Sequence, residues 1–63
     1  MTTRVKETRR SKGIKQETIA QKVNIALRTY QRYENGTRVP DVYKAQEIAN
    51  AVNEPVTYLF PLK

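Results

Sequence analysis

The sequence predicts an all-α fold, and three observations support that prediction. Residues 16–36 contain two short amphipathic segments with the repeat of an α-helix, separated by a break at residues 24–26. Residues 42–52 show the same repeat, with apolar side chains on one face. The 63 residues include no Cys and no His, which excludes disulfides and the usual zinc sites. A chain of this length has a thin core and depends on well-packed helices or on dimerisation.

The opening segment, residues 3–12, is predicted to form a helix with Thr2 or Thr3 as its N-cap. Its apolar face is weak, because Val5 is the only large aliphatic residue in the segment. Something besides apolar burial must therefore hold this helix. Arg9 lies one turn after Val5, and we expect it to face inward and supply that contact.

The second helix is predicted over residues 16–23, and its N-cap position lacks a side chain of the usual capping type. Lys15 stands at the N-cap position, where it accepts no hydrogen bond and places a cation at the positive end of the helix dipole. Two interpretations stay equally open: a phosphate binds at this helix end together with Lys15, or Lys15 is a tolerated surface residue. Asn24 is expected to end the helix in the left-handed conformation, as Asn53 does after the fourth helix.

The third helix, from an N-cap at Ala26 to a stop at Gly36, is predicted to separate its side chains by polarity. Ala26, Tyr30 and Tyr33 are expected to face the core. The opposite face carries a row of mostly hydrogen-bonding side chains, namely Leu27, Arg28, Gln31, Arg32 and Asn35. Two helices joined by so tight a turn, the second presenting such a row, are typical of a helix-turn-helix that reads DNA, here at about residues 16–36.

The remaining segments are predicted to support this pair of helices. Asp41 is expected to cap a fourth helix over residues 42–52. That helix should bury four apolar residues, Ala45, Ile48, Ala49 and Val52. Its other face, which includes Lys44, should be solvated. Pro55 can start a short final turn. The apolar residues of that turn are expected to cover the core or a dimer partner: Val56, Leu59 and Phe60.

Positive charge is concentrated near the start of the chain. The net charge is +6, and residues 1–15 hold six cations against one acidic residue, Glu7. This is the electrostatic footprint of a polyanion binder, although a solvated basic tail would have the same composition. No apolar run reaches the length of a membrane span and no signal-peptide pattern opens the chain, so we expect a cytoplasmic protein without a membrane partner.

The segment QETIAQKVNIALRTYQRYENG, followed by Pro40, AQEIANAV and VTYLF, resembles the Cro/C1-type (XRE-type) helix-turn-helix family. The most specific matches, at the spacings of the family, are Gln16, Ala20, Glu34, Gly36, Pro40 and Ala49. The resemblance covers about residues 4–60. It implies a compact five-helix bundle, the lambda repressor-like DNA-binding domain, which dimerises on pseudo-palindromic double-stranded DNA and regulates transcription. Residues 1–63 are accordingly expected to form a single domain.

The resemblance also implies roles for individual residues. Six are expected to meet DNA bases: Gln16, Leu27, Arg28, Thr29, Gln31 and Arg32. Four are expected to contact DNA phosphates: Arg10, Lys15, Asn35 and Arg38. Arg9 and Glu34 match a buried ion pair that ties the first helix to the third in similar repressors. The chain departs from the family by having Asn at 24 and 53 in place of Gly, and Tyr30 in place of an aliphatic residue.

The predicted function is a sequence-specific transcriptional regulator, more specifically a dimeric repressor. An antitoxin of a toxin pair or a restriction-modification controller would bind DNA in the same way, so both stay open as alternatives. The alternative outside DNA-binding proteins is a protein-interaction module, in which the same helix face docks onto an acidic protein. RNA binding is disfavoured because a row of exposed aromatics is missing. Without a Ser/His or Cys/His set or a close carboxylate pair, neither an enzyme nor a metal, cofactor or small-molecule site is expected.

Overall fold

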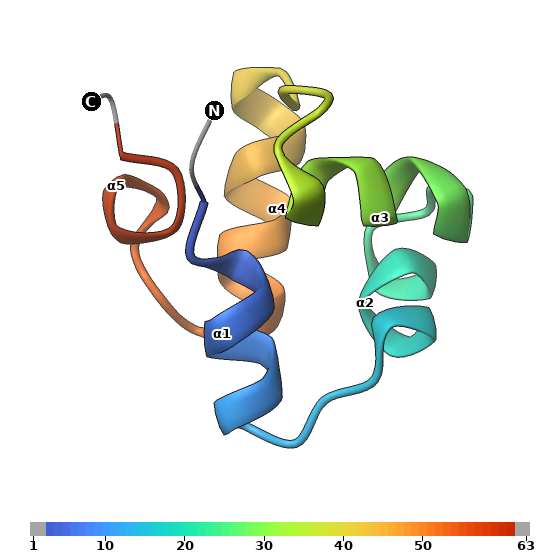
Figure 1. The fold of residues 1–63 in the computed structure, drawn as a ribbon, viewed down its shortest axis with the longest axis horizontal. Helices are drawn as coiled ribbons and strands as arrows, with labels where there is room; N and C mark the ends of the chain where they lie inside the picture. The colour runs from blue at the N-terminus through green and yellow to red at the C-terminus, as the bar shows by residue number, and fades with distance from the viewer. Residues whose placement is uncertain (1–2, 62–63) are drawn as a thin grey trace.

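The computed structural model describes residues 3–61, which form five helices and no strand (Figure 1). In chain order the helices are α1 (Val5–Ser11), α2 (Gln16–Lys22), α3 (Leu27–Asn35), α4 (Val42–Val52) and α5 (Val56–Leu59). The predicted all-α, five-helix architecture is confirmed. The predicted bounds of α3 and α4 are confirmed. Helix α1 is shorter than predicted at both ends and α2 ends one residue earlier, as frayed helix termini commonly do.

The core draws on every helix. Each contributes at least one residue without exposed surface: Val5, Ile19, Tyr30, Ile48 with Ala49, and Leu59. Helix α4 stands behind α1 in Figure 1, with α5 on one side and the α2–α3 pair on the other. Both α2 and α5 pack against α4, and α3 packs against α1 and α2. The α2–α3 pair is therefore held from behind by α1 and α4, which leaves one side of α3 to solvent.

A residue in the left-handed backbone conformation follows each of the first four helices and lets the chain turn sharply. Gly13 and Gly36 have φ of 69° and 79°, and Asn24 and Asn53 have φ of 58° and 60°. The predicted conformation of both asparagines is confirmed. Asn tolerates this region because its short side chain can hydrogen-bond locally, so it replaces Gly here without a change of backbone.

The start of α1 is held by tertiary contacts instead of a side-chain cap. The prediction of Thr3 as N-cap is wrong, because Arg4 occupies that position and the Thr3 hydroxyl donates to the Glu34 carbonyl at 3.2 Å. Thr2 lies outside the described residues. Arg4 N donates to the Leu59 carbonyl at 2.9 Å, and the Arg4 guanidinium lies 4.8 Å from the centroid of the Tyr58 ring. Contacts with α3 and α5 thus anchor the start of α1, which has no side-chain cap.

Two further predictions fail for physical reasons. Ala26 is exposed, not buried, because as the N-cap of α3 it has an extended backbone and does not share the helical face of Tyr30. Lys44 is not simply solvated: its Nζ donates to the Val23 carbonyl at 2.7 Å and pairs with Glu47 at 2.9 Å. Val23 is the C-cap of α2, so Lys44 satisfies a carbonyl that the helix itself leaves without a partner.

The predicted cap of α4 is present. Asp41 Oδ1 accepts a hydrogen bond from the backbone N–H of Lys44 at 2.8 Å. We expect Asp41→Ala to lower the free energy of unfolding by about 1 kcal/mol, because this N–H then loses its partner within the chain. For a domain of this size that loss corresponds to a fall in Tm of roughly 4–8 °C, measurable by circular dichroism. Asp41→Asn keeps an acceptor and should stay close to wild type; an equal loss in both variants would contradict a capping role.

Candidate nucleic-acid interface

The α2–α3 pair is joined by a short and well-fixed turn. Val23 and Asn24 end α2, and the backbone N–H of Ile25 donates back to the Ala20 carbonyl at 3.0 Å. Ile25 is half-buried and packs against the core. The turn thereby holds α3 at a fixed angle to α2. This arrangement allows α3 to present its solvent side as a rigid surface.

Helix α3 divides its residues between the core and solvent. Tyr30 and Tyr33 are buried, as predicted, whereas Arg28, Arg32 and Asn35 are exposed. Gln31 lies at the edge of this exposed side, next to Gln16 of α2, and is half-buried. We call the four residues that form this side the outer face of α3: Arg28, Gln31, Arg32 and Asn35. The two guanidinium groups are one helical turn apart, so they can reach neighbouring positions on one extended partner.

Leu27 and Thr29 are less available to a partner than the arginines. Leu27 is half-buried and packs against the core cluster, and Thr29 is also half-buried. The sequence placed Leu27 on the polar side of α3 as a base-contacting residue. Because it lies in the first turn of α3, beside α2, part of its side chain closes the core. Only the remainder is accessible from the outer face.

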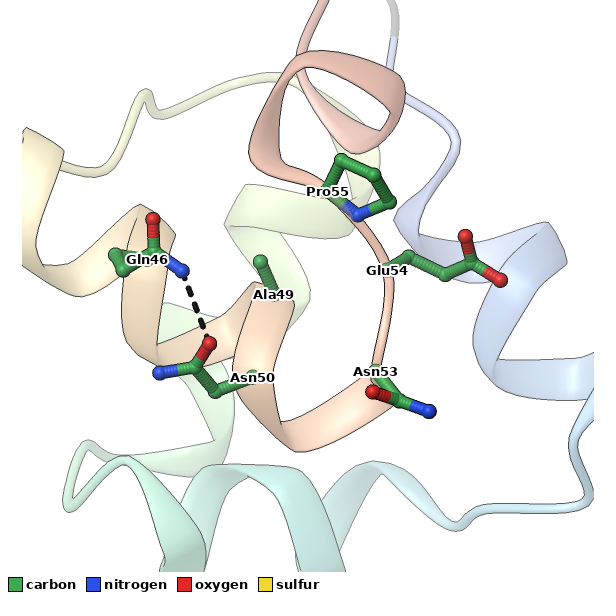
Figure 2. Close-up of a pocket in the computed structure, with 6 residues that line it drawn as sticks. All are labelled: Gln46, Ala49, Asn50, Asn53, Glu54 and Pro55. Atoms are coloured by element: carbon green, nitrogen blue, oxygen red, sulfur yellow. Dashed lines mark hydrogen bonds between the residues drawn. The ribbon is translucent and has the colours of Figure 1, made fainter.

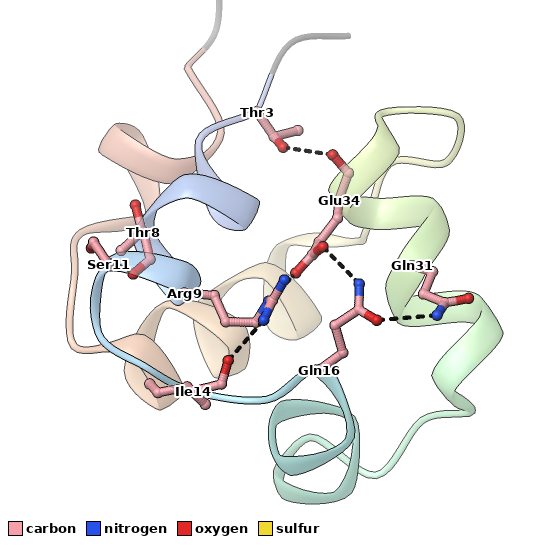
Figure 3. Close-up of polar contacts among 8 residues, drawn as sticks. All are labelled: Thr3, Thr8, Arg9, Ser11, Ile14, Gln16, Gln31 and Glu34. Atoms are coloured by element: carbon pink, nitrogen blue, oxygen red, sulfur yellow. Dashed lines mark hydrogen bonds and ion pairs between the residues drawn. The ribbon is translucent and has the colours of Figure 1, made fainter.

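A buried ion pair lies beneath α3. Arg9 Nε and Glu34 Oε2 are 2.6 Å apart, and the two side chains are 11% and 1% exposed (Figure 3). Arg9 Nη1 also donates to the Ile14 carbonyl at 2.7 Å. The structure therefore brings together the two residues that the resemblance pairs. Through them α1, the loop that follows it and α3 are held together.

The environment keeps both members of the pair ionised. Burial alone raises the pKa of the Glu34 carboxyl, but hydrogen bonds from Arg9 and other neighbours outweigh it and leave this pKa below its ordinary value. Burial lowers the pKa of Arg9, and the bond and charge of Glu34 more than reverse that effect. Burial raises the pKa of Tyr30, which stays neutral. Its hydroxyl lies close enough to influence Glu34, yet forms no hydrogen bond of ordinary geometry within residues 3–61.

Two glutamines connect this pair to the outer face of α3. Gln16 Nε2 donates to Glu34 Oε1 at 3.0 Å, and Gln31 Nε2 donates to Gln16 Oε1 at 3.1 Å (Figure 3). Sequence reasoning assigned both glutamines to DNA bases and missed their contact with each other. The available signal was the spacing of Gln31 and Glu34, which places them on adjacent positions of one helix surface, above the start of α2.

A family model described as helix-turn-helix matches residues 5–59 of the chain. The protein belongs to the Cro/C1-type helix-turn-helix family. The match covers all five helices, so the resemblance and the lambda repressor-like fold are confirmed. Members of this family are DNA-binding domains and not enzymes, which also agrees with the sequence analysis. A search of curated proteins found no match.

As a helix-turn-helix protein, the chain has further cations around α3 that are exposed. Arg10 belongs to the last turn of α1, Lys15 is the N-cap of α2, and Arg38 follows α3 in the loop to α4. No acidic side chain among residues 3–61 forms an ion pair with these three cations, or with Arg28 and Arg32. Their charges are therefore available to an anionic partner. Asn35, the fourth predicted phosphate contact, is exposed at the end of α3.

Three hollows of this helix-turn-helix domain lie away from the outer face of α3. One, of about 410 Å³, is lined by Gln46, Ala49, Asn50, Asn53, Glu54 and Pro55 (Figure 2). Gln46 Nε2 donates to Asn50 Oδ1 at 2.9 Å across its edge. Residues 3–61 contain no cluster of His, Cys, Asp or Glu able to hold a metal ion. Within the same residues, none of the helices combines the length and the apolar character needed to cross a membrane. The candidate interface is thus a surface and not a cleft.

Proposed function

We propose that this protein is a sequence-specific transcriptional regulator, a cytoplasmic repressor whose residues 1–63 act as one domain. It binds a pseudo-palindromic operator as a homodimer and lays α3 in the major groove. The observation that carries this proposal is the outer face of α3, where Arg28 and Arg32 are exposed and pair with no acidic residue among residues 3–61. Each guanidinium can donate two hydrogen bonds to guanine O6 and N7.

Around these base contacts, Arg10, Lys15, Asn35 and Arg38 contact phosphates and fix the register of α3 on the duplex. All four are exposed. Gln31 contributes to base recognition beside the arginines. The accessible parts of Leu27 and Thr29 can pack on a thymine methyl group, the apolar feature of the major groove.

A second copy of the chain is proposed to pack on the start of α4. Leu59 and Phe60, two of the residues predicted for the core or a dimer contact, are buried in the core and unavailable to a partner. The large apolar side chains most exposed among residues 3–61 are Val39, Val42 and Tyr43, at 61%, 72% and 80%. Val39 lies in the loop after α3, and Val42 and Tyr43 form the start of α4, so a dimer joined there would link the two copies close in sequence to the end of α3.

Selection of bound duplexes from a random pool, at near-physiological salt, tests the proposed function. The expected product is an inverted repeat with half-sites roughly one helical turn apart. The affinity for that operator should fall steeply with salt, with a slope near −0.9 for each phosphate neutralised. Recovery of unrelated sequences only would contradict a sequence-specific regulator and favour a protein-docking role for α3. Recovery of single half-sites would contradict the homodimer.

A further inference from the structure

A continuous line of hydrogen bonds runs from the core to the outer face of α3. It begins at Arg9, whose Nε donates to Glu34 Oε2, and passes through Glu34 Oε1 to Gln16 and on to Gln31 (Figure 3). The four side chains come from α1, α2 and α3. They pass from 1% exposure at Glu34 to half-buried amides at Gln16 and Gln31. The outer end of this line, Gln31, lies one helical turn after Arg28, at the edge of the outer face that adjoins α2.

The direction of every bond in this line follows from its inner end. A carboxylate paired with Arg9 can only accept hydrogen bonds, so Gln16 must turn its NH₂ group toward Glu34. The Gln16 oxygen then faces Gln31, and an oxygen can only accept. Gln31 must therefore donate one N–H to Gln16. Reversing either amide would place an oxygen against an oxygen or two NH₂ groups together, with the loss of at least one hydrogen bond.

What remains on Gln31 is one carbonyl oxygen and one N–H. Neither is bonded to another residue in the part of the chain that the structure describes. Adenine offers the complementary pair in the major groove, an N6–H donor beside the N7 acceptor. Guanine offers two acceptors there, so the Gln31 oxygen would face O6 without a proton between them. An amide held in this orientation selects adenine over guanine.

We propose that Gln16 is a positioning residue that holds the Gln31 amide ready to bind adenine at one base pair of each half-site. Gln16 itself reads no base, in contrast to the role that the family resemblance implies for it, because both ends of its amide bond to protein groups. An ordered Gln31 loses less side-chain entropy on binding than a freely rotating one. This inference rests on the proposed function, since it requires α3 to enter the major groove.

The test compares Gln16→Met with Gln31→Ala on the operator recovered by selection. The relative affinity for all four base pairs is measured at each operator position. Gln31→Ala should abolish the preference for adenine at one position. Gln16→Met should reduce the preference at that same position by a part of the roughly 5- to 150-fold that one bidentate contact supplies, and leave the other positions unchanged. Added to Gln31→Ala, Gln16→Met should have no further effect on preference.

Gln21→Met provides the matched control, because Gln21 is an exposed glutamine on the same helix. It should leave every preference unaltered. If Gln16→Met acts only through stability, Tm falls and the affinities for all operators fall together, which would overturn the positioning role. Altered preference at a position that does not depend on Gln31 would also overturn it, since Gln16 would then contact a base directly.

Nuclear magnetic resonance of the unbound protein separates this inference from the proposed function. The two side-chain N–H signals of Gln31 should show an ordered amide in wild type and a mobile one in Gln16→Met. Equal order in both proteins would overturn the positioning role even where sequence preference is intact. A wild-type protein with no sequence preference would instead overturn the proposed function, and the adenine selection with it.

Discussion

Arg9→Met is expected to lower the free energy of unfolding by roughly 3–5 kcal/mol, because it leaves the Glu34 carboxylate buried without its cation. Glu34 is 1% exposed, so solvent cannot replace the lost partner. At about 0.05–0.15 kcal/mol per residue, a chain of 63 residues has only some 3–9 kcal/mol in total. The variant should therefore lose a large share of its stability and have a much lower Tm than wild type. Urea unfolding followed by circular dichroism measures the loss.

Two further variants test this explanation. Arg9→Met combined with Glu34→Leu removes both charges, and it should be more stable than Arg9→Met alone. Lys12→Met provides the control, because Lys12 and Glu54 form a pair at 3.3 Å whose side chains are 32% and 34% exposed. That variant should change stability by less than about 1 kcal/mol. A double variant no more stable than Arg9→Met would mean that packing of the Arg9 side chain, and not its charge, is what α1 requires.

The same pair predicts how stability depends on pH. The folded pKa of Glu34 lies below its ordinary value of 4.5, so the folded state binds its proton less readily than the unfolded chain. The stability that Glu34 contributes is present above pH 4.5 and is lost as pH falls toward the folded pKa. Urea titrations between pH 7 and pH 2 should show this loss in wild type, and a shallower dependence in Glu34→Gln.

The helices were predictable because their determinants are local. The apolar repeat of α4, the Asp41 cap and the left-handed asparagines each depend on residues a few positions apart. In the same way, the period of α3 was enough to separate its buried tyrosines from Arg28 and Arg32. Local rules therefore gave the correct fold class and the outer face of α3.

Contacts between distant residues were beyond those rules. Thr3 has the chemistry of an N-cap, but its hydroxyl bonds to α3 because the start of α1 packs there. The sequence predicts a solvated Lys44, yet its Nζ donates a hydrogen bond to the Val23 carbonyl at the end of α2. The Gln16–Gln31 bond joins residues that each look suited to DNA. Long polar side chains can turn to several partners, so their bonds are decided by packing that a single sequence does not reveal.

Arg28→Ala and Arg32→Ala are each expected to weaken operator binding by about 1–3 kcal/mol, roughly 5- to 150-fold in Kd. The physical reason is the loss of two hydrogen bonds to guanine, at a different base pair for each arginine. Both side chains are exposed and neither supports the core, so the unbound variants should keep the Tm of wild type. Competition of operator variants in a fluorescence binding assay measures affinity and preference together.

Alanine substitutions of two other cations serve as controls that distinguish base contacts from phosphate contacts and from a general effect of charge. Arg38→Ala should lower affinity for all sequences alike and reduce the salt slope by about one, as expected of a phosphate contact. Lys22→Ala removes the same charge beside Glu47 and Asn50, on the α4 side of the domain, and should have little effect. If Arg28→Ala and Arg32→Ala behave like Arg38→Ala, then α3 contacts only the DNA backbone. Relaxed preference at one base pair per arginine would instead mean that the exposed row on α3 reads sequence.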